Sequence, residues 1–313
     1  MGILEPLNFT GDKPPLALIA GPTASGKSGC AVALARQVEG AGGRAVIINA
    51  DSAQVYADLR VLSARPAAEE MGSVDHRLFG TWDGAAACSA ADWAGAAKRQ
   101  IAAVHASGGV PMLVGGTGLY LRTLLEGIAP IPPINFVVRE EVRAMPQEEA
   151  RAALEREDAV SAARLAPADR ARTQRALEVV RATGRAIGEW RTLKSGGIEG
   201  YVELDARILL PEREWLYARC DARFAAMVEG GAIAEVEALL ARALNPALPV
   251  MRAIGVPELA AYLRGDLLLE EAIAAGQQAT RQYAKRQYTW FRRQPPAQWR
   301  RLEWAAPPLA PDG

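Results

Sequence analysis

The stretch Leu16-Ala17-Leu18-Ile19-Ala20, followed directly by the octapeptide G-P-T-A-S-G-K-S, decides the fold of this chain. The five apolar residues are typical of a buried strand, and the Ala-rich segment from Lys27 to about Val38 predicts a helix. The octapeptide matches G-x-x-x-x-G-K-[ST], which is specific for phosphate when it lies between a strand and a helix. Loop amides and the helix N-terminus then bind anions, assisted by the ammonium group of Lys27. The predicted phosphate-binding residues are Gly21, Pro22, Thr23, Ala24, Ser25, Gly26, Lys27 and Ser28.

Further strands and helices alternate along the chain after this loop. Residues 45–49 and 111–114 predict two more buried strands, and a helix is expected from about Ala90 to Ala106. Such alternation predicts an α/β fold in which a parallel sheet carries helices on both faces. Ligands bind at the carboxyl ends of such strands, where Asp51 and Gly115 follow the second and third of them.

The character of the chain changes after Pro132 and Pro133. Residues from about 136 to 194 are rich in Ala, Arg and Glu and predict helices only. A strand is expected at 206–210, and helices continue from Pro211 to about Arg293. These features predict a P-loop core with a basic helical C-terminus (1–131 and 204–313), a helical insertion (132–203) and a disordered tail from Ala305.

The composition is that of an ordinary globular protein. Of 313 residues, 50% are hydrophobic and 23% are charged, and no apolar run is long enough to span a membrane. The N-terminal residues lack the apolar core of a signal peptide. Three separated cysteines and only two histidines argue against disulfides and a structural zinc site. We therefore expect a cytoplasmic protein.

The charge is balanced overall but uneven along the chain. With 36 basic and 36 acidic residues, the chain is not basic as a whole, as a dedicated nucleic-acid binder usually is. However, residues 272–302 contain no acidic residue, and their seven basic residues are interleaved with Tyr283, Tyr288, Trp290 and Phe291. Residues 160–194 carry eight basic and three acidic residues. These two segments predict basic faces for RNA, although the aromatic side chains could equally belong to the core.

Asp51 leaves several roles open when it is considered alone. It could ligate a metal, act as a general base or simply cap the next helix. The phosphate loop by itself favours ATP and a kinase or ATPase activity.

Six segments together favour one interpretation, because they resemble the tRNA dimethylallyltransferase (isopentenyltransferase) family over nearly the whole chain. The segments are G-P-T-A-S-G-K-S, D-S-A-Q-V-Y at 51–56, G-G-T-G-L-Y at 115–120, Q-R-A-L-E at 174–178, R-A-I-G at 252–255 and T-R-Q-Y-A-K-R-Q-Y-T-W-F-R-R at 280–293.

The resemblance implies transfer of a dimethylallyl group from dimethylallyl diphosphate to the exocyclic amine of the adenine 3′ of the anticodon. The loop would then hold a diphosphate leaving group, whose developing charge is stabilised by Lys27, Arg223 and Mg²⁺ bound at Ser28. Asp51 matches the catalytic aspartate and is assigned as general base, and Thr117 matches the threonine beside the reacting centre. Arg219, one turn before Arg223, could share its role.

The resemblance also implies two substrates, the tRNA anticodon stem-loop and dimethylallyl diphosphate, and a monomer with no stable protein partner. The target adenine would leave its stack to reach the site. The implied tRNA contacts are Asp51, Ser52, Ala53, Gln54, Thr117, Arg139, Ala171, Arg172, Thr173, Gln174, Arg175, Arg252, Gly255, Lys285, Arg286, Gln287, Trp290 and Arg292.

The chain departs from the family pattern at three places, at residues 76–80, 134–136 and 256–257. These departures concern local tRNA contacts and the shape of the prenyl pocket. Three alternatives stay open: a P-loop kinase of a small metabolite, an adenylate-type isopentenyltransferase and a noncatalytic RNA-binding protein.

Overall fold

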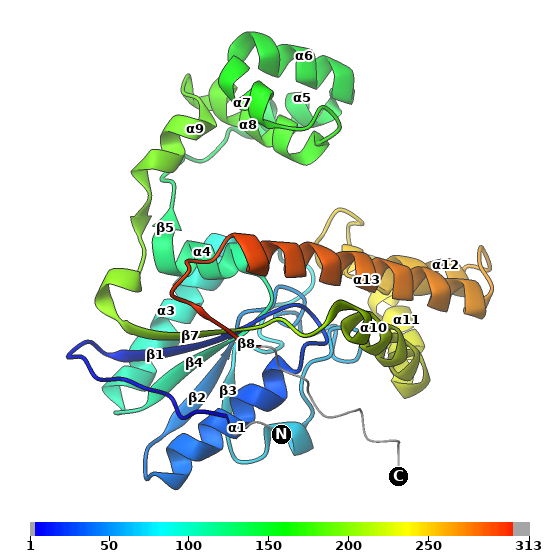
Figure 1. The fold of residues 1–313 in the computed structure, drawn as a ribbon. Coiled ribbons are helices and arrows are strands. Elements are labelled where there is room, and N and C mark those ends of the chain that lie inside the picture. Colours follow the sequence, from blue (N-terminus) through cyan, green and yellow to red (C-terminus); the bar gives the residue numbers. More distant parts are fainter. Residues whose placement is uncertain (1–3, 303–313) are drawn as a thin grey trace. The chain divides into compact units, whose positions relative to one another are not determined.

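A parallel sheet of six strands forms the centre of the computed structural model, which describes residues 4–302 (Figure 1). The strand order is β3-β2-β4-β1-β7-β8, and every neighbouring pair is parallel. Their bounds are β1 (Pro15–Ala20), β2 (Ala45–Asn49), β3 (Asp75–Arg77), β4 (Val110–Gly115), β7 (Glu203–Leu209) and β8 (Arg300–Leu302). The α/β fold predicted from the sequence is confirmed.

The strands β1, β2 and β4 are the runs recognised in the sequence, and β7 begins three residues earlier than expected. The sequence did not predict β3 and β8. Each is a three-residue strand at a sheet edge with no fully buried residue, so neither has the apolar pattern of an inner strand.

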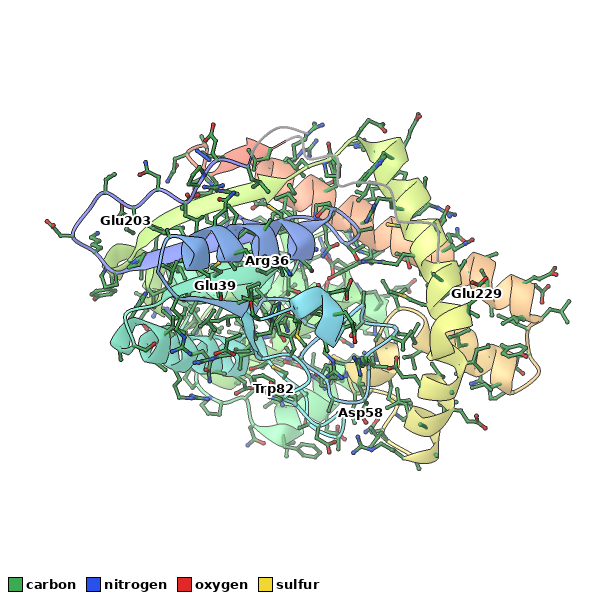
Figure 2. The ribbon with its side chains drawn as sticks, turned by 90° about the horizontal axis from the view of Figure 1, so that it is seen from below. Arg36, Glu39, Asp58, Trp82, Glu203 and Glu229 are labelled. Carbon is green, nitrogen blue, oxygen red and sulfur yellow. The ribbon has the colours of Figure 1, made fainter. Side chains whose placement is uncertain are left out.

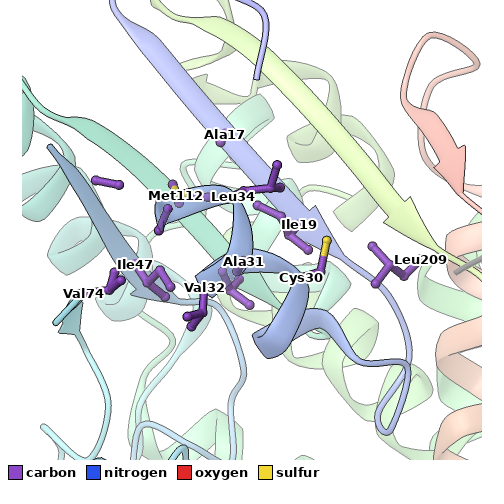
Figure 3. Close-up of a cluster of buried hydrophobic side chains, with 13 residues drawn as sticks. Ala17, Ile19, Cys30, Ala31, Val32, Leu34, Ile47, Val74, Met112 and Leu209 are labelled. Carbon is purple, nitrogen blue, oxygen red and sulfur yellow. The ribbon is translucent and has the colours of Figure 1, made fainter. Parts of the chain in front are cut away.

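Helices cover the sheet and gather at one end of it. Alternate residues of β1, β2 and β4 face α1, and Figure 3 shows Ile19, Ile47 and Met112 packed against Ala31 and Leu34 of that helix. The helices after β7 gather at one end of the sheet (Figure 1). The bounds in this unit are α1 (Lys27–Gly40), α2 (Ala68–Met71), α3 (Ala90–Ala106), α4 (Gly118–Glu126), η2 (Glu199–Tyr201), α10 (Arg213–Met227), the π-helical η3 (Val228–Ala232), α11 (Ile233–Ala241), η4 (Val250–Arg252), α12 (Val256–Leu263) and α13 (Leu269–Arg293).

A loop from Asp58 to Ser63 is fastened to α11. The carboxylate of Glu235 accepts hydrogen bonds from the amides of Val61 (2.8 Å) and Leu62 (2.9 Å). Asp58, which lies beside the yellow helices in Figure 2, forms an ion pair with Arg242. These contacts fix the backbone that carries Leu62 into the site described below.

Residues 125–198 form a separate compact unit. It consists of α5 (Phe136–Ala144), α6 (Gln147–Glu157), α7 (Ala159–Arg164), α8 (Arg170–Thr183), α9 (Ile187–Trp190), the 3-10 turn η1 (Arg191–Leu193) and the two-stranded ribbon of β5 (Gly127–Ile128) and β6 (Ser195–Gly196). Val142, Leu154 and Leu177 are among the side chains of its own buried core.

This unit is the insertion expected from the sequence, with different bounds. Its predicted range was 132–203, but the β5–β6 ribbon pairs Gly127 with Gly196 and therefore brings the start of the insertion forward. The range ends earlier because residues after 198 belong with the core, where β7 begins at Glu203. The tail from Ala305 lies outside the described residues. Within residues 4–302, no helix is both long and apolar enough to cross a membrane.

Candidate active site

The octapeptide of residues 21–28 joins β1 to α1, as the sequence predicted. Gly21 is required by close packing, because a Cβ atom there would lie 2.5 Å from the carbonyl oxygen of Leu209. Gly26 directly precedes the helix with φ of 86°, a left-handed conformation that favours glycine. The loop therefore ends at a helix N-terminus, which is suited to bind anions.

Lys27 is held inside this loop. Its ammonium group donates a hydrogen bond to the carbonyl oxygen of Pro22 at 3.0 Å. Burial lowers the pKa of Lys27 to about 8, an effect that the charge of Asp51 opposes and that of Arg223 reinforces. Lys27 is thus a poorly solvated cation, and an anionic ligand would relieve its lack of counter-charge.

Two arginines of α10 reach the loop. Arg223 donates a hydrogen bond to Oγ1 of Thr23, and the Nε atom of Arg219 donates to the carbonyl oxygen of Ala24 at 3.2 Å. Burial lowers the pKa of Arg223, yet a guanidinium remains charged at neutral pH. Both arginines thus lie beside the phosphate loop, where they could bind a diphosphate, and that role stays a prediction.

Asp51 and Thr117 lie at the carboxyl ends of neighbouring strands and share backbone contacts. Oδ1 of Asp51 accepts a hydrogen bond from the amide of Ala53 at 2.9 Å. Oγ1 of Thr117 accepts one from the amide of Ser52 at 2.9 Å and donates to the Ser52 hydroxyl at 3.2 Å. These bonds fix the Asp51 carboxylate and the Thr117 hydroxyl to the backbone of the consecutive residues Ser52 and Ala53.

A cavity of about 350 Å³ opens beside these groups. Of the residues singled out in the sequence, it is lined by Thr23, Asp51, Ser52, Ala53, Arg223, Arg252 and Arg286. The sequence did not assign the other lining residues to this site, which are Tyr56, Leu62, Ser63, Cys88, Tyr120, Cys220, Phe224, Met227, Pro249, Ala253, Ile254, Thr280 and Tyr283. The volume suits a small organic ligand rather than a folded macromolecule.

Tyr283 is the most informative of these additional residues. It forms a hydrogen bond with Thr117, and burial together with the nearby charge of Asp51 raises its pKa. Its hydroxyl therefore stays protonated beside the catalytic candidates. The sequence had marked Tyr283 only as one aromatic residue of the basic C-terminal segment.

Two predicted tRNA contacts have other partners inside the core. The Gln54 amide donates hydrogen bonds to the carbonyl oxygens of Ser63 (3.0 Å) and Ala64 (2.7 Å), so its N–H groups hold a loop rather than facing outward to read a base. Gln287 is buried, with 6% of its surface exposed. The structure thus shows partners within the protein for both side chains, which the motif did not reveal, and their contact with tRNA stays a prediction.

The remaining predicted tRNA contacts divide between surface and interior. On α13, Lys285, Arg286 and Arg292 are exposed, whereas Trp290 is half-buried against Gly118. Gly255 is buried beside the side chain of Leu62. Basic and core-facing side chains thus share this helix.

The insertion shows the same division. Ala171 and Arg172 of α8 are exposed, Gln174, Arg175 and Arg139 are half-buried, and Thr173 is fully buried. A direct contact between Thr173 and RNA does not fit this placement.

A magnesium ion has a limited donor set here. Ser28 is exposed at the start of α1, and residues 4–302 contain no group of three His, Cys, Asp or Glu side chains that could hold a metal. Mg²⁺ commonly uses few protein oxygens and completes its shell with water and substrate phosphates. The Ser28 hydroxyl is compatible with that mode of binding.

A phosphate loop bound by two arginines, beside a cavity that Thr23, Asp51 and Arg223 line, defines an α/β enzyme of the phosphate-loop class. The chain belongs to the IPP transferase family, whose model matches residues 54–294. Relatives named tRNA dimethylallyltransferase include one from Erythrobacter litoralis, 66% identical over 94% of this chain and 92% of the relative. Another from Novosphingobium aromaticivorans is 67% identical over 83% of this chain and 92% of the relative.

Solved structures agree with this assignment. The tRNA isopentenylpyrophosphate transferase of Bacillus halodurans has a TM-score of 0.66 at 33% identity, covering 93% of this chain and 90% of its own. A eukaryotic dimethylallyltransferase described as acting on tRNA has a TM-score of 0.75 at 26% identity, covering 88% of this chain and 69% of its own. The resemblance read from the sequence is confirmed, and the chain is a prenyl transferase of this family.

Proposed function

We propose that this chain transfers a dimethylallyl group from dimethylallyl diphosphate to the exocyclic amine of the adenine 3′ of the anticodon in tRNA. The observation that carries the proposal is the placement of four side chains: Lys27 and Arg223 bind the phosphate loop, Asp51 lines the cavity together with Arg223, and Thr117 binds the cavity-lining Ser52. The first two groups suit the leaving diphosphate, and the other two suit the attacking amine.

The charges explain how the allylic bond would break. Departure of diphosphate builds negative charge on its oxygens, and Lys27 and Arg223 are cations already held at the loop. Their burial removes competing water, so the attraction is strongest when that charge develops. Mg²⁺ would be held by Ser28 and the diphosphate oxygens and would supply further charge neutralisation.

Asp51 would take the proton that the amine loses. An adenine amine is a weak nucleophile because its lone pair is delocalised into the ring, so attack on carbon requires a proton acceptor. The amide of Ala53 fixes one carboxylate oxygen of Asp51. The hydroxyl of Thr117 is held by Ser52 and by Tyr283, on whose pKa the charge of Asp51 also acts, and it would position the base or the diphosphate.

The exposed basic residues support tRNA as the acceptor. Lys285, Arg286 and Arg292 are exposed on one helix, and Arg286 also lines the cavity. These basic side chains would bind the backbone of an RNA whose base enters the site. Arg172 of the insertion would add a phosphate contact of its own.

Labelled dimethylallyl diphosphate tests the proposal in parallel reactions with Mg²⁺ and either tRNA or AMP. We expect label in tRNA alone. Label in AMP would instead identify an adenylate-type enzyme. Turnover of ATP without prenyl transfer would identify a kinase or ATPase, and binding of tRNA with neither reaction would identify a noncatalytic RNA-binding protein.

A further inference from the structure

Gln287 joins the helix α13 to two loops of the active site. Its Oε1 atom accepts a hydrogen bond from the amide of Thr23 at 2.8 Å, and its Nε2 atom donates one to the carbonyl oxygen of Gly116 at 2.8 Å. Thr23 belongs to the phosphate loop, and Gly116 belongs to the turn after β4 that leads to Thr117. One side-chain amide thus fixes the distance between the phosphate site and the Thr117 site.

The side-chain amide of Gln287 packs closely against Gly116. A Cβ atom at Gly116 would lie 2.3 Å from Nε2 of Gln287, so a glycine is required for this close approach. The side chain is 6% exposed, and both of its polar atoms have partners. Any replacement that lacks either function leaves a buried amide or carbonyl group unpaired, which is costly.

The contact also determines how the phosphate loop can bind. The Thr23 amide is bonded to Gln287 and the Thr23 hydroxyl accepts from Arg223, so the amide and the hydroxyl of this residue are already engaged. Thr23 is therefore held in a fixed orientation before any ligand arrives. A preorganised loop loses less entropy on binding and stabilises developing charge more effectively.

We propose that Gln287 is a positioning residue that holds the phosphate loop in register with the Gly116–Thr117 turn, rather than a contact for RNA. This inference rests on the proposed function, because it takes diphosphate as the ligand that binds the loop held by Gln287. Residues on the exposed face of the same helix, such as Lys285, would serve tRNA instead. The two faces of α13 would thus have separate tasks.

The variants Gln287→Leu and Gln287→Glu test this assignment. Leucine removes both hydrogen bonds, so we expect the KM for dimethylallyl diphosphate to rise about tenfold or more, whereas the Kd for tRNA changes less than about twofold. Thr289→Ala is the matched control, because Thr289 is exposed two residues further along the helix. Thermal unfolding of each variant reports whether the protein is folded.

The variant Gln287→Glu adds a readout that lost packing would not produce. Its ionised carboxylate would keep an acceptor for the Thr23 amide but repel the Gly116 carbonyl, whereas the protonated carboxyl group could donate to that carbonyl. Burial raises a carboxyl pKa, so the ratio of the variant's KM to that of the wild type should fall as pH decreases from 8 to 6. If Gln287→Leu does not fold, the pH dependence of the KM ratio for Gln287→Glu tests the positioning role of Gln287 by itself.

Binding of inorganic pyrophosphate, measured by calorimetry with saturating tRNA present, separates this inference from the proposed function. If the wild type does not bind pyrophosphate, the diphosphate site itself is refuted. If the wild type binds and both variants bind equally well, only the role of Gln287 is refuted. A raised tRNA Kd with an unchanged diphosphate KM would likewise overturn the inference and return Gln287 to RNA recognition.

Discussion

The guanidinium group of Arg223 donates a hydrogen bond to the hydroxyl of Thr23, although 200 positions separate the two residues in the sequence. The contact brings a cation of α10 to a loop that follows β1. Because both arginine and loop are already in place, the site needs little rearrangement when charge develops on a leaving group. Arg223 and the loop thus form one structural unit from two distant segments, which we propose as the diphosphate site.

Replacing Arg223 by lysine tests the geometry of this site. Lysine keeps the positive charge but lacks the planar fork that can bond Thr23 and a phosphate oxygen together. We expect kcat/KM for dimethylallyl diphosphate to fall about 10²-fold, as for loss of one transition-state donor. Steady-state kinetics at saturating tRNA provide the measurement.

Thr23→Val serves as the comparison for that variant. It removes the hydroxyl that Arg223 contacts but leaves the arginine and its charge. We expect a loss of about tenfold, smaller than that of Arg223→Lys. If Arg223→Lys has the same kcat/KM as the wild type, the guanidinium geometry is irrelevant.

Lys27 predicts a pH dependence of diphosphate binding. Its pKa is lowered to about 8 in the free protein, and a bound diphosphate favours the charged form and so raises that pKa. Above pH 8 binding must then take up a proton, and the Kd for pyrophosphate should rise up to about tenfold per pH unit. Titrations between pH 7 and 9.5 with saturating tRNA measure this slope.

Lys27→Met is the control for the pH effect. The Kd of this variant for pyrophosphate should already be high at pH 7, and it should not rise further above pH 8 as the wild-type Kd does. A wild-type Kd that stays constant from pH 7 to 9.5 would be incompatible with a lysine of lowered pKa contacting the phosphates.

Asp51→Asn tests the general base. Asparagine keeps the shape and can still accept the hydrogen bond from Ala53, but it does not take up a proton. We expect prenyl transfer to fall at least about 10²-fold while tRNA binding persists. Single-turnover transfer and a filter-binding assay measure the two quantities, and turnover near that of the wild type would refute the assignment.

Binding of tRNA should weaken strongly with salt. Neutralising backbone phosphates releases counterions, so log Kd is expected to rise linearly with log salt concentration. Replacing Lys285 or Arg292 by alanine should reduce that slope by about one each if each contacts a phosphate. A flat salt dependence in the wild type would contradict an electrostatic RNA surface.

The sequence identified those parts of the site that local rules govern. The phosphate loop has a fixed spacing between a strand and a helix, and Asp51 follows a buried strand directly, so both positions could be predicted. Arg223 required the family resemblance, because nothing in its own helix distinguishes it from a solvated arginine.

Other features depend on tertiary packing and had no local signal. Gln287 lies in a basic helix between exposed Arg286 and half-buried Tyr288, and only the fold shows that it turns inward to Thr23 and Gly116. Leu62 reaches the cavity because Glu235 of a distant helix binds its loop. The edge strand β8 pairs with β7 without an apolar pattern of its own.

The most direct test of the central claim is mass spectrometry of tRNA after incubation with this protein, dimethylallyl diphosphate and Mg²⁺. Nuclease fragments should show one added dimethylallyl group, confined to the adenine 3′ of the anticodon and absent when Asp51→Asn replaces the wild type. An adduct on free AMP, or unmodified tRNA despite bound substrates, would contradict the account.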